Sequence, residues 1–364
     1  MRVAAFVNAG TSTSFPVELS AAIDRETDAS VSVVSFLDDS VEAMDQDVAA
    51  LDIDFACLGG TSRFDGAAYR RLRRLLPEYD VLHTHYNAIG SLGRLAAIGT
   101  GVSVVNTEHN DHRHFSHLQN VTNAASYPAV DAFVANSEST RASLRAYERP
   151  LLARSRVETI YNGIDLGRVD AGRRRTDVPA LPDGPTILTA ATLTAQKNLE
   201  PLIRAMGRVR QAVPDATLVV VGDGPKRQRL RTVAVAAGVS DGVTFTGFLP
   251  EREQVYALMD DATVFAVTSH YEGFCNAAVE AMACGLPVVA SDIDVLREVV
   301  AGGGRFVDQD APADIADALV GLLEDEGART SLGARGRERA RENFSLERCA
   351  REYADLYAAV DSER

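Results

Sequence analysis

The chain has 364 residues, 46% of them hydrophobic, and a formal net charge of −14. This length allows two hydrophobic cores and exceeds one ordinary domain. The acidic balance argues against nucleic acid as the main partner. The four cysteines are scattered without a Cys-x2-Cys pair, so neither a disulfide framework nor a zinc site is indicated. No apolar run approaches a membrane span and no signal peptide is apparent, so we expect a cytoplasmic protein.

Short β-branched runs alternate with helical patterns along the chain, which is typical of parallel βαβ units. In the first half, strands are predicted at residues 2–7, 31–36, 54–58, 81–83, 102–106, 132–134 and 157–160. In the second half, they are predicted at residues 186–189, 217–221, 243–246, 264–267, 287–290 and 305–307. Residues 165–185 between the two sets are rich in Gly, Pro, Asp and Arg without a periodic apolar face. This composition indicates a linker.

We therefore predict the α/β class, with two Rossmann-like doubly wound parallel-sheet domains that face a central cleft. The first domain is expected over residues 1–166, the linker over 167–185 and the second domain over 186–344, and a last helix over 345–361. Ligands of such sheets bind beyond the carboxyl ends of the strands. Polar residues that follow a strand are therefore candidate site residues.

Polar residues follow several predicted strands of the first domain. The candidates on this side are Gly10, Thr11, Ser12, His85, His109 and Asn110. An imidazole at such a position can form hydrogen bonds with sugar hydroxyls, whereas Glu108 is expected to be structural. His112, His114 and His117 follow, and a His-rich segment can indicate metal binding. Because no carboxylate–His spacing of a known metal site occurs, a mobile loop lining the cleft is the preferred interpretation.

Basic residues are almost all arginine, since the chain has two lysines, Lys197 and Lys226. The retention of Lys197 suggests that a compact ammonium is needed there. A basic cluster is formed by Arg70, Arg71, Arg73 and Arg74, with Arg63 and Arg94 nearby in sequence. A solvated helix face explains this cluster, and the alternative is a patch that meets anionic lipid head groups or an anionic acceptor.

Residues 270–291 form the most informative segment because they place Glu272 and Glu280 eight positions apart. A short helix is predicted over Asn276–Ala283. The first amides of a helix lack intrahelical partners, and together with the helix dipole they favour a phosphate. The residues around this helix start are Phe274, Cys275 and Asn276. Glu280 lies roughly 12 Å of helix rise from Glu272, so each acid can reach a group on a different side of the phosphate.

This block, with Glu-Ala-Met-Ala-Cys-Gly-Leu-Pro-Val-Val running on from Glu280, resembles the Glu-x7-Glu signature of retaining GT-B glycosyltransferases. The type is glycosyltransferase family 4, also called glycosyl transferases group 1. The resemblance covers nearly the whole chain and is sharpest over residues 189–291. It implies that Glu272 binds hydroxyls of the donor sugar, that Glu280 binds the ribose hydroxyls, and that the amides at the helix start hold the diphosphate.

Other segments of the second domain fit the same family. Members usually have Gly-Arg-Leu followed by a lysine five positions after the arginine; here Lys197 matches and Thr192 replaces the arginine. The resemblance implies that Lys197 stabilises the leaving diphosphate, while Thr192 supplies no second cation. The nucleotide-binding segments implied by the resemblance are the turn with Gly222 and Gly224 and the backbone at Phe248 and Leu249.

In the first domain, the resemblance implies an acceptor site. Relatives have a glycine-rich loop at Gly10 that touches sugar and phosphate, and His109 matches a position near the donor sugar and acceptor. The last helix is implied to pack back on this domain. We expect no cofactor and no essential metal, because Lys197 and a helix start serve the phosphates and the Asp-x-Asp pairs lie in the wrong fold context.

The sequence thus predicts a retaining transfer of sugar from a UDP-, GDP- or ADP-sugar to a sugar or lipid-linked acceptor, in glycan, glycolipid or glycoconjugate biosynthesis. The protein is expected in the cytoplasm, with peripheral contact at the inner face of the membrane through the basic cluster as an option. The alternatives are a nucleotide-sugar epimerase, a sugar phosphorylase, or a catalytically weakened subunit that binds nucleotide sugar. A dinucleotide oxidoreductase is disfavoured because no Gly-x-Gly-x-x-Gly follows a strand.

Overall fold

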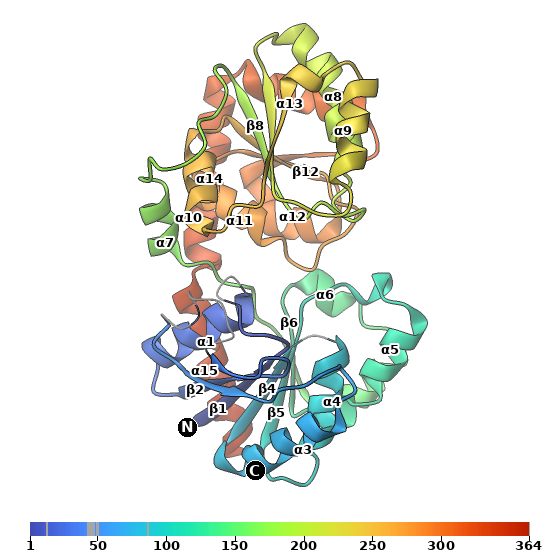
Figure 1. Ribbon diagram of the computed structural model, residues 1–364, viewed down its shortest axis with the longest axis vertical. Helices are drawn as coiled ribbons and strands as arrows, with labels where there is room; N and C mark the ends of the chain where they lie inside the picture. Colours follow the sequence, from blue (N-terminus) through green and yellow to red (C-terminus); the bar gives the residue numbers. More distant parts are fainter. Residues whose placement is uncertain (12–13, 42–47, 49–50, 86, 364) are drawn as a thin grey trace. The chain divides into compact units, whose positions relative to one another are not determined.

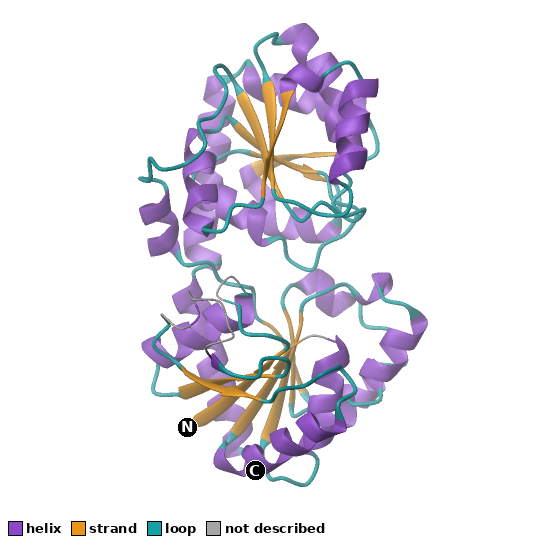
Figure 2. Cartoon of the chain, in the orientation of Figure 1, coloured by secondary structure: helices purple, strands orange, loops and turns teal. Residues whose placement is uncertain are grey.

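The structure is a computed structural model that describes residues 1–11, 14–41, 48, 51–85 and 87–363 (Figure 1). The chain divides into two compact units. Unit 1 contains Met1–Gly163 and Leu346–Arg364, and unit 2 contains Ile164–Ser345. Each unit is built on one parallel sheet with helices on both faces (Figure 2). The predicted class, two Rossmann-like parallel-sheet domains, is confirmed.

The sheet of unit 1 has the strand order β3-β2-β1-β4-β5-β6-β7, and all pairs are parallel. Its strands are β1 (Arg2–Val7), β2 (Ser30–Ser35), β3 (Asp54–Cys57), β4 (Val81–His85), β5 (Ser103–Glu108), β6 (Ala132–Ala135) and β7 (Arg156–Thr159). The direction of the strand order reverses between β1 and β4. In open parallel sheets, ligands bind in the crevice outside the carboxyl ends at such a reversal.

Two hydrophobic cores cover the two faces of this sheet, because successive strand residues point to opposite sides. Ala4 and Phe6 belong to one core, whereas Val3 and Ala5 belong to the other. The helices of the unit are α1 (Phe15–Glu26), α3 (Gly66–Leu75), α4 (Asn87–Ala97), α5 (His117–Ala124), α6 (Glu138–Ala142) and α15 (Leu346–Ser362). The last helix, α15, lies beside α1 (Figure 1). Its buried tyrosines join the core that contains Val3.

The sheet of unit 2 has the order β10-β9-β8-β11-β12-β13, again with parallel pairs, and reverses between β8 and β11. Its strands are β8 (Thr186–Ala190), β9 (Thr217–Val221), β10 (Val243–Gly247), β11 (Val264–Val267), β12 (Val288–Ser291) and β13 (Gly304–Val307). Its helices are α7 (Leu166–Gly172), α8 (Leu199–Ala212), α9 (Arg227–Ala236), α10 (Arg252–Asp261), α11 (Asn276–Ala283), α12 (Asp294–Val300), α13 (Pro312–Leu323) and α14 (Glu326–Asn343).

Helix α7 lies largely within the segment that the sequence predicts as a linker. Asp165 caps it by accepting a hydrogen bond from the Arg168 amide at 2.8 Å, which satisfies one of the orphan amides of the first turn. Val169 is buried, and Gly172 leaves room for Tyr256 of α10. Seven residues are too few to show a helical period, so the sequence does not reveal this helix.

None of the helices in the described ranges combines the length and apolar character that crossing a membrane requires.

Candidate active site

An ion pair joins the two loops that flank the strand reversal of unit 2. Lys197 follows β8 and Glu272 follows β11. The Lys197 Nζ donates to Glu272 Oε1 at 2.5 Å, and the Ser269 hydroxyl donates to the same oxygen at 2.7 Å. Burial disfavours the charge on Lys197, but the Glu272 carboxylate outweighs this effect and raises the pKa of the lysine. A charged ammonium and an oriented carboxylate therefore share one edge of the sheet.

Helix α11 begins next to this pair. Cys275 is its N-cap residue and adopts a left-handed conformation with φ 78°, which is uncommon and strained for a residue with a side chain. The preceding Phe274 is buried and packs edge-to-face on Phe344 with ring centroids 5.3 Å apart. Packing thus holds the strained turn that presents the helix start. The contact of this start, from Phe274 to Asn276, with a diphosphate stays a prediction.

Glu280 lies inside α11 and has a cation of its own. Arg252, the first residue of α10, donates from Nε to Glu280 Oε1 at 2.7 Å and also contacts this oxygen through Nη2. Both side chains are largely buried, at 19% and 6% exposure. The structure therefore gives each of the two predicted acids a separate partner. Arg252 was not among the predicted site residues, because no local pattern connects two side chains 28 positions apart.

The glycine turn after β9 packs directly against the loop that carries Thr192. Gly222 and Gly224 have φ values of 117° and 157°. A Cβ at Gly222 would lie 2.1 Å from the Ala191 carbonyl oxygen, and one at Gly224 would lie 2.6 Å from the Leu193 nitrogen. Only glycine allows this approach. The structure therefore brings the predicted nucleotide-binding turn and the exposed Thr192 together.

The segment with Phe248 and Leu249 borders the same turn. The Gly222 amide donates to the Gly247 carbonyl at 2.8 Å. Phe248, which follows, exposes 72% of its surface. A large exposed ring beside a glycine turn is compatible with stacking on a planar ligand.

In unit 1, His85 and His109 face each other at the ends of β4 and β5. His85 Nδ1 lies 3.0 Å from His109 Nε2, and the rings are stacked with centroids 5.3 Å apart. His83 lies against His85, with ring centroids 4.0 Å apart. Burial lowers the pKa of His109 to about 4, partly opposed by Glu108. The His109 ring is therefore neutral at pH 7 and can donate to, or accept from, a hydroxyl.

A cavity of about 670 Å³ lies beside the loop after β1. Its lining residues are Asn8, Ala9, Thr11, Ser14, Arg63, Ala88 and Ile89. The Gly10 amide donates to Asp38 Oδ2 at 2.7 Å, so this glycine serves the loop's own structure. Ser12, a predicted acceptor residue, lies outside the described residues. Asn110 is exposed and is absent from the lining.

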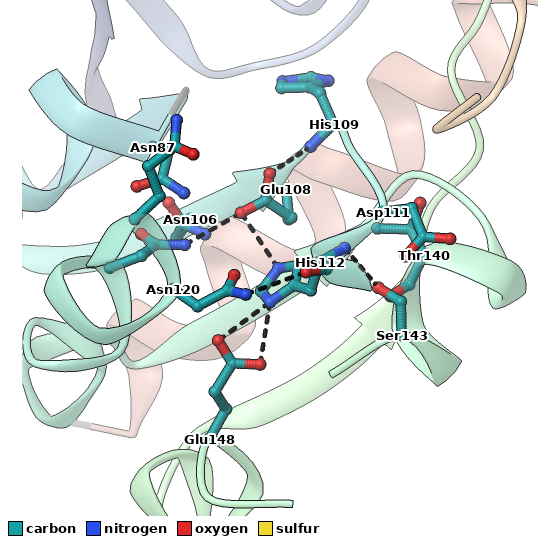
Figure 3. A network of polar contacts seen from close by, with 12 residues as sticks. Asn87, Asn106, Glu108, His109, Asp111, His112, Asn120, Thr140, Ser143 and Glu148 are labelled. Carbon is teal, nitrogen blue, oxygen red and sulfur yellow. Dashed lines mark hydrogen bonds and ion pairs between the residues drawn. The ribbon is translucent and has the colours of Figure 1, made fainter. Parts of the chain in front are cut away.

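The preferred interpretation of the His-rich segment was wrong for His112. This residue is fully buried in the 3-10 helix η3 (His112–His114), between Glu108 and Glu148 (Figure 3). His114 and His117 are exposed, and His117 begins α5. The sequence could not show this because Glu148 follows 36 residues later. In the part of the chain that the structure describes, no group of three or more His, Cys, Asp or Glu side chains could hold a metal ion.

The basic cluster is only partly a solvated helix face. Arg71 donates to the Leu58 and Gly59 carbonyl oxygens, and Arg73 donates to those of Ala96 and Ile98. All four clustered arginines, Arg70, Arg71, Arg73 and Arg74, remain exposed. Arg94, by contrast, is completely buried and takes no part in a surface patch.

Two sequence families match the chain. The family described as "Glycosyl transferases group 1" matches residues 173–339, and "Glycosyltransferase Family 4" matches residues 17–168. A D-inositol 3-phosphate glycosyltransferase of Salinispora tropica is 32% identical over 331 residues, which cover 80% of this chain and 66% of that protein. A GDP-mannose-dependent alpha-(1-6)-phosphatidylinositol monomannoside mannosyltransferase of Mycolicibacterium smegmatis is 30% identical over 292 residues, covering 75% of each.

Among solved structures, the Anabaena protein Alr3699/HepE in complex with UDP-glucose is similar to the chain. It superposes with a TM-score of 0.80 at 19% identity and covers 99% of this chain and 100% of its own. At this identity, the likeness bears on the fold alone.

Proposed function

The chain belongs to the glycosyltransferases of the group 1 and family 4 type, and we propose that it transfers a sugar from a nucleoside diphosphate to an acceptor hydroxyl with retention of the anomeric configuration. The Lys197–Glu272 ion pair beside the start of α11 carries this proposal. It combines a fixed cation and a helix start, which favour a diphosphate, with a carboxylate that can accept hydrogen bonds from sugar hydroxyls. The product would enter glycan, glycolipid or glycoconjugate biosynthesis.

Unit 2 is proposed to bind the donor. The diphosphate would lie against the start of α11 and share Lys197 with Glu272. As the bond to the sugar breaks, negative charge develops on the leaving diphosphate, so a nearby ammonium stabilises the transition state. Glu272 would hold the donor sugar, and Glu280, oriented by Arg252, would hold the ribose hydroxyls.

No enzymic nucleophile is required in this proposal. The bond from the acceptor oxygen to the anomeric carbon forms on the face from which the bond to the diphosphate oxygen breaks. The acceptor's proton passes to the leaving diphosphate. Thr192, in place of the usual arginine, leaves Lys197 as the cation of this loop, and the missing charge would cost on the order of 2–4 kcal/mol of transition-state stabilisation. The reaction is proposed to need neither a metal ion nor another cofactor.

Unit 1 is proposed to bind the acceptor in the cavity beside Thr11. Among the described lining residues, Arg63 is the charged one. Its guanidinium lies over the Phe64 ring at 5.7 Å. A cation beside hydroxyls and an amide suits an acceptor with a phosphate or carboxylate group. The names of the two relatives, an inositol phosphate and a phosphatidylinositol glycosyltransferase, agree with this proposal.

Peripheral contact with an anionic membrane is also proposed, from the cytoplasmic side. Arg70 and Arg74 lie exposed on α3, and the neighbouring Phe64 exposes 75% of its surface. Basic groups near an anionic surface contribute about 1 kcal/mol each. Sedimentation with phosphatidylserine vesicles should fall when Arg70 and Arg74 are both replaced by glutamine. Equal sedimentation of the two proteins would contradict this contact.

A nucleotide-sugar panel tests the proposed function. UDP-glucose, GDP-mannose and ADP-glucose are each added to the protein, and thermal unfolding and donor hydrolysis are measured. A donor present at a hundred times its Kd adds about 2.7 kcal/mol of stability. With the donor known, inositol phosphates and simple sugars serve as acceptors, and NMR of the product gives its anomeric configuration.

Each alternative gives a different result in this panel. Inversion of configuration would overturn retention, and an absence of binding and hydrolysis for every donor would overturn the proposal. An epimerase would form product without an acceptor, and a phosphorylase would depend on inorganic phosphate. A weakened subunit would bind donor without transfer or hydrolysis.

A further inference from the structure

In the interior of unit 1, His112 lies between two carboxylates. Its side chain is fully buried, with Nδ1 2.9 Å from Glu148 Oε2 and Nε2 3.3 Å from Glu108 Oε2. Glu108 and Glu148 are themselves 4% and 0% exposed. A neutral imidazole has one N–H group and would turn a lone pair toward one of these carboxylates. The doubly protonated ring donates from Nδ1 to Glu148 and places its second N–H group at ion-pair distance from Glu108.

The surrounding charges balance when His112 is an imidazolium. A second buried cation, Arg94, donates to Ser126 Oγ at 2.8 Å and to the side-chain oxygen of Asn123. Asn123 in turn donates from Nδ2 to Glu108 Oε2 at 3.1 Å. The interior therefore holds two cations and two carboxylates that are linked by hydrogen bonds and ion pairs. Removing one cation would leave a buried carboxylate without compensation, which is costly.

The same network reaches the backbone of His109. Glu108 Oε1 accepts a hydrogen bond from the His109 amide at 3.1 Å, while Oε2 faces His112 (Figure 3). The other end of this turn is also held, because the His112 amide donates to Ser143 Oγ at 3.0 Å and its carbonyl accepts from Asn120 Nδ2 at 3.0 Å. One carboxylate thus connects the buried imidazolium to the residue that carries the candidate site imidazole.

We propose that His112 is a positioning residue: as an imidazolium it fixes Glu108, and through Glu108 it fixes the backbone of His109 and the direction of the His109 ring toward His85. The inference rests on the proposed function and on the prediction from the sequence that His109 binds a sugar hydroxyl. Buried residues behind a site can hold a polar group of the site in the geometry on which turnover depends. A misplacement of about 1 Å can lower the reaction rate about 10²-fold.

Other ionisable groups also lie around His112. Arg145 donates from its backbone amide to Glu148 Oε2 and from Nη2 to the His112 carbonyl. Burial raises the pKa of Tyr127 well above its usual value, so the phenol stays neutral, and His109 is neutral as well. Burial disfavours the charge on His112, but Glu108 and Glu148 outweigh it and raise its pKa to about 9.

Glu148→Gln tests the role with a side chain of nearly the same shape. Removing this carboxylate lowers the pKa of His112, so the ring loses its proton at a lower pH. We expect kcat to retain its value in acid and to fall about 10- to 100-fold by pH 9, with the alkaline limb at lower pH than in the unmodified protein. The KM for the donor should stay the same, because the donor is bound by unit 2.

Two comparison variants separate positioning from general damage. His112→Gln removes the charge at every pH, so it should show the low kcat throughout and should not recover in acid. Glu158→Gln removes an exposed carboxylate of the same unit, which pairs with Arg156, and should leave the pH profile unchanged. Turnover is measured with UDP-glucose or GDP-mannose, whichever the unmodified protein uses. An unshifted alkaline limb in Glu148→Gln would overturn the proposal.

Nitrogen-15 NMR of the histidine rings tests the charge of His112 and its effect on His109 without an activity measurement. At pH 7, His112 should give the signature of an imidazolium in the unmodified protein. In Glu148→Gln, its titration should move to lower pH, and the ring signals of His85 and His109 should change over the same pH range. A neutral His112 at pH 7, or a His112 titration that leaves His109 unaffected, would refute the positioning role. Absence of transfer by a protein with the expected NMR behaviour would refute the proposed function instead.

Discussion

Arg252, the first residue of α10, forms an ion pair with Glu280 of α11 and so joins these two helices of unit 2. The Arg252 Nε donates to Glu280 Oε1 at 2.7 Å, and the Tyr256 hydroxyl lies 3.5 Å from the same oxygen. Both ionic side chains are largely withdrawn from water. The arrangement resembles the support of Glu272 by Lys197 and Ser269.

Arg252→Gln should weaken nucleotide binding through Glu280. Loss of one partner from a buried pair typically costs about 3–5 kcal/mol, and part of this cost should appear as poorer recognition of the ribose diol. Calorimetry with UDP and 2′-deoxy-UDP, or with the guanosine pair if GDP binds, gives the ratio of their Kd values. We expect this ratio to fall toward one. Arg229→Gln, which breaks an exposed pair with Glu200, is the control, and an unchanged ratio in Arg252→Gln would contradict the role.

Lys197→Ala should lower kcat by about 10²–10³-fold, as loss of one group that stabilises developing charge usually does. The ammonium is held charged beside Glu272, so the variant also leaves that carboxylate without its cation. Lys226→Ala, at the other lysine of the chain, is a charge-matched control. Steady-state transfer assays at saturating donor measure both. Turnover within about threefold of the unmodified protein would exclude Lys197 from the transition state.

Glu272→Gln should impair transfer more than it impairs nucleotide binding. The amide keeps the size of the side chain but loses the negative charge, so it binds sugar hydroxyls less strongly, while the diphosphate and ribose contacts remain. The affinity for UDP or GDP should change by less than about threefold, whereas kcat/KM for the nucleotide sugar should fall about 100-fold. Equal losses in the two measurements would show that Glu272 acts on the nucleotide rather than on the sugar.

Features of this protein that depend on neighbouring residues in the sequence could be predicted, whereas contacts between distant residues could not. Each predicted strand overlaps an observed one, because β-branched runs bounded by turn residues indicate strands without knowledge of the partners. Helix α11 was predicted with its observed bounds. The turn at Cys275 adopts the left-handed conformation that favours glycine, which the residue type did not indicate.

The ion pairs could not be predicted in the same way. Arg252 and Glu280 are 28 positions apart, and His112 and Glu148 are 36 apart. Neither spacing follows a helical or strand period, so only the packing of separate elements brings these side chains together. The interpretation of the His-rich segment was wrong for His112 for the same reason. Without a known metal-site spacing, the segment was interpreted as a mobile loop lining the cleft, while the carboxylates around His112 come from β5 and from the turn before the 3-10 helix η5 (Arg149–Leu152).

Arg63→Gln should raise the KM for an anionic acceptor without changing the KM for the donor. The arginine lines the cavity beside Thr11, and a hydrogen bond to a charged group contributes about 1.5–3 kcal/mol, which corresponds to a KM increase of about 10- to 100-fold. Two acceptors that differ only in a phosphate group provide the decisive comparison, because the neutral one should be insensitive to the substitution. Equal effects on both would mean that Arg63 shapes the cavity and does not bind charge.

Two histidines of unit 1, His83 and His109, should make the protein less stable in acid. Burial lowers the pKa of His83 to about 3, with a smaller effect from His109, and it lowers that of His109 to about 4. The unfolded chain titrates near 6.5 and binds more protons below that pH, so the free energy of unfolding falls as the pH drops from about 6.5 toward 4, by about 3 kcal/mol for each histidine. Urea unfolding at a series of pH values measures how the free energy of unfolding changes with pH.

His83→Gln should reduce the slope of the free energy of unfolding against pH. The variant also loses the hydrogen bonds to Thr107 and Tyr357. This loss lowers the absolute stability but does not set the slope, because the slope depends on proton uptake. The exposed His117→Asn should keep the full slope, and a His83→Gln slope equal to it would show that His83 is not the group that takes up the proton.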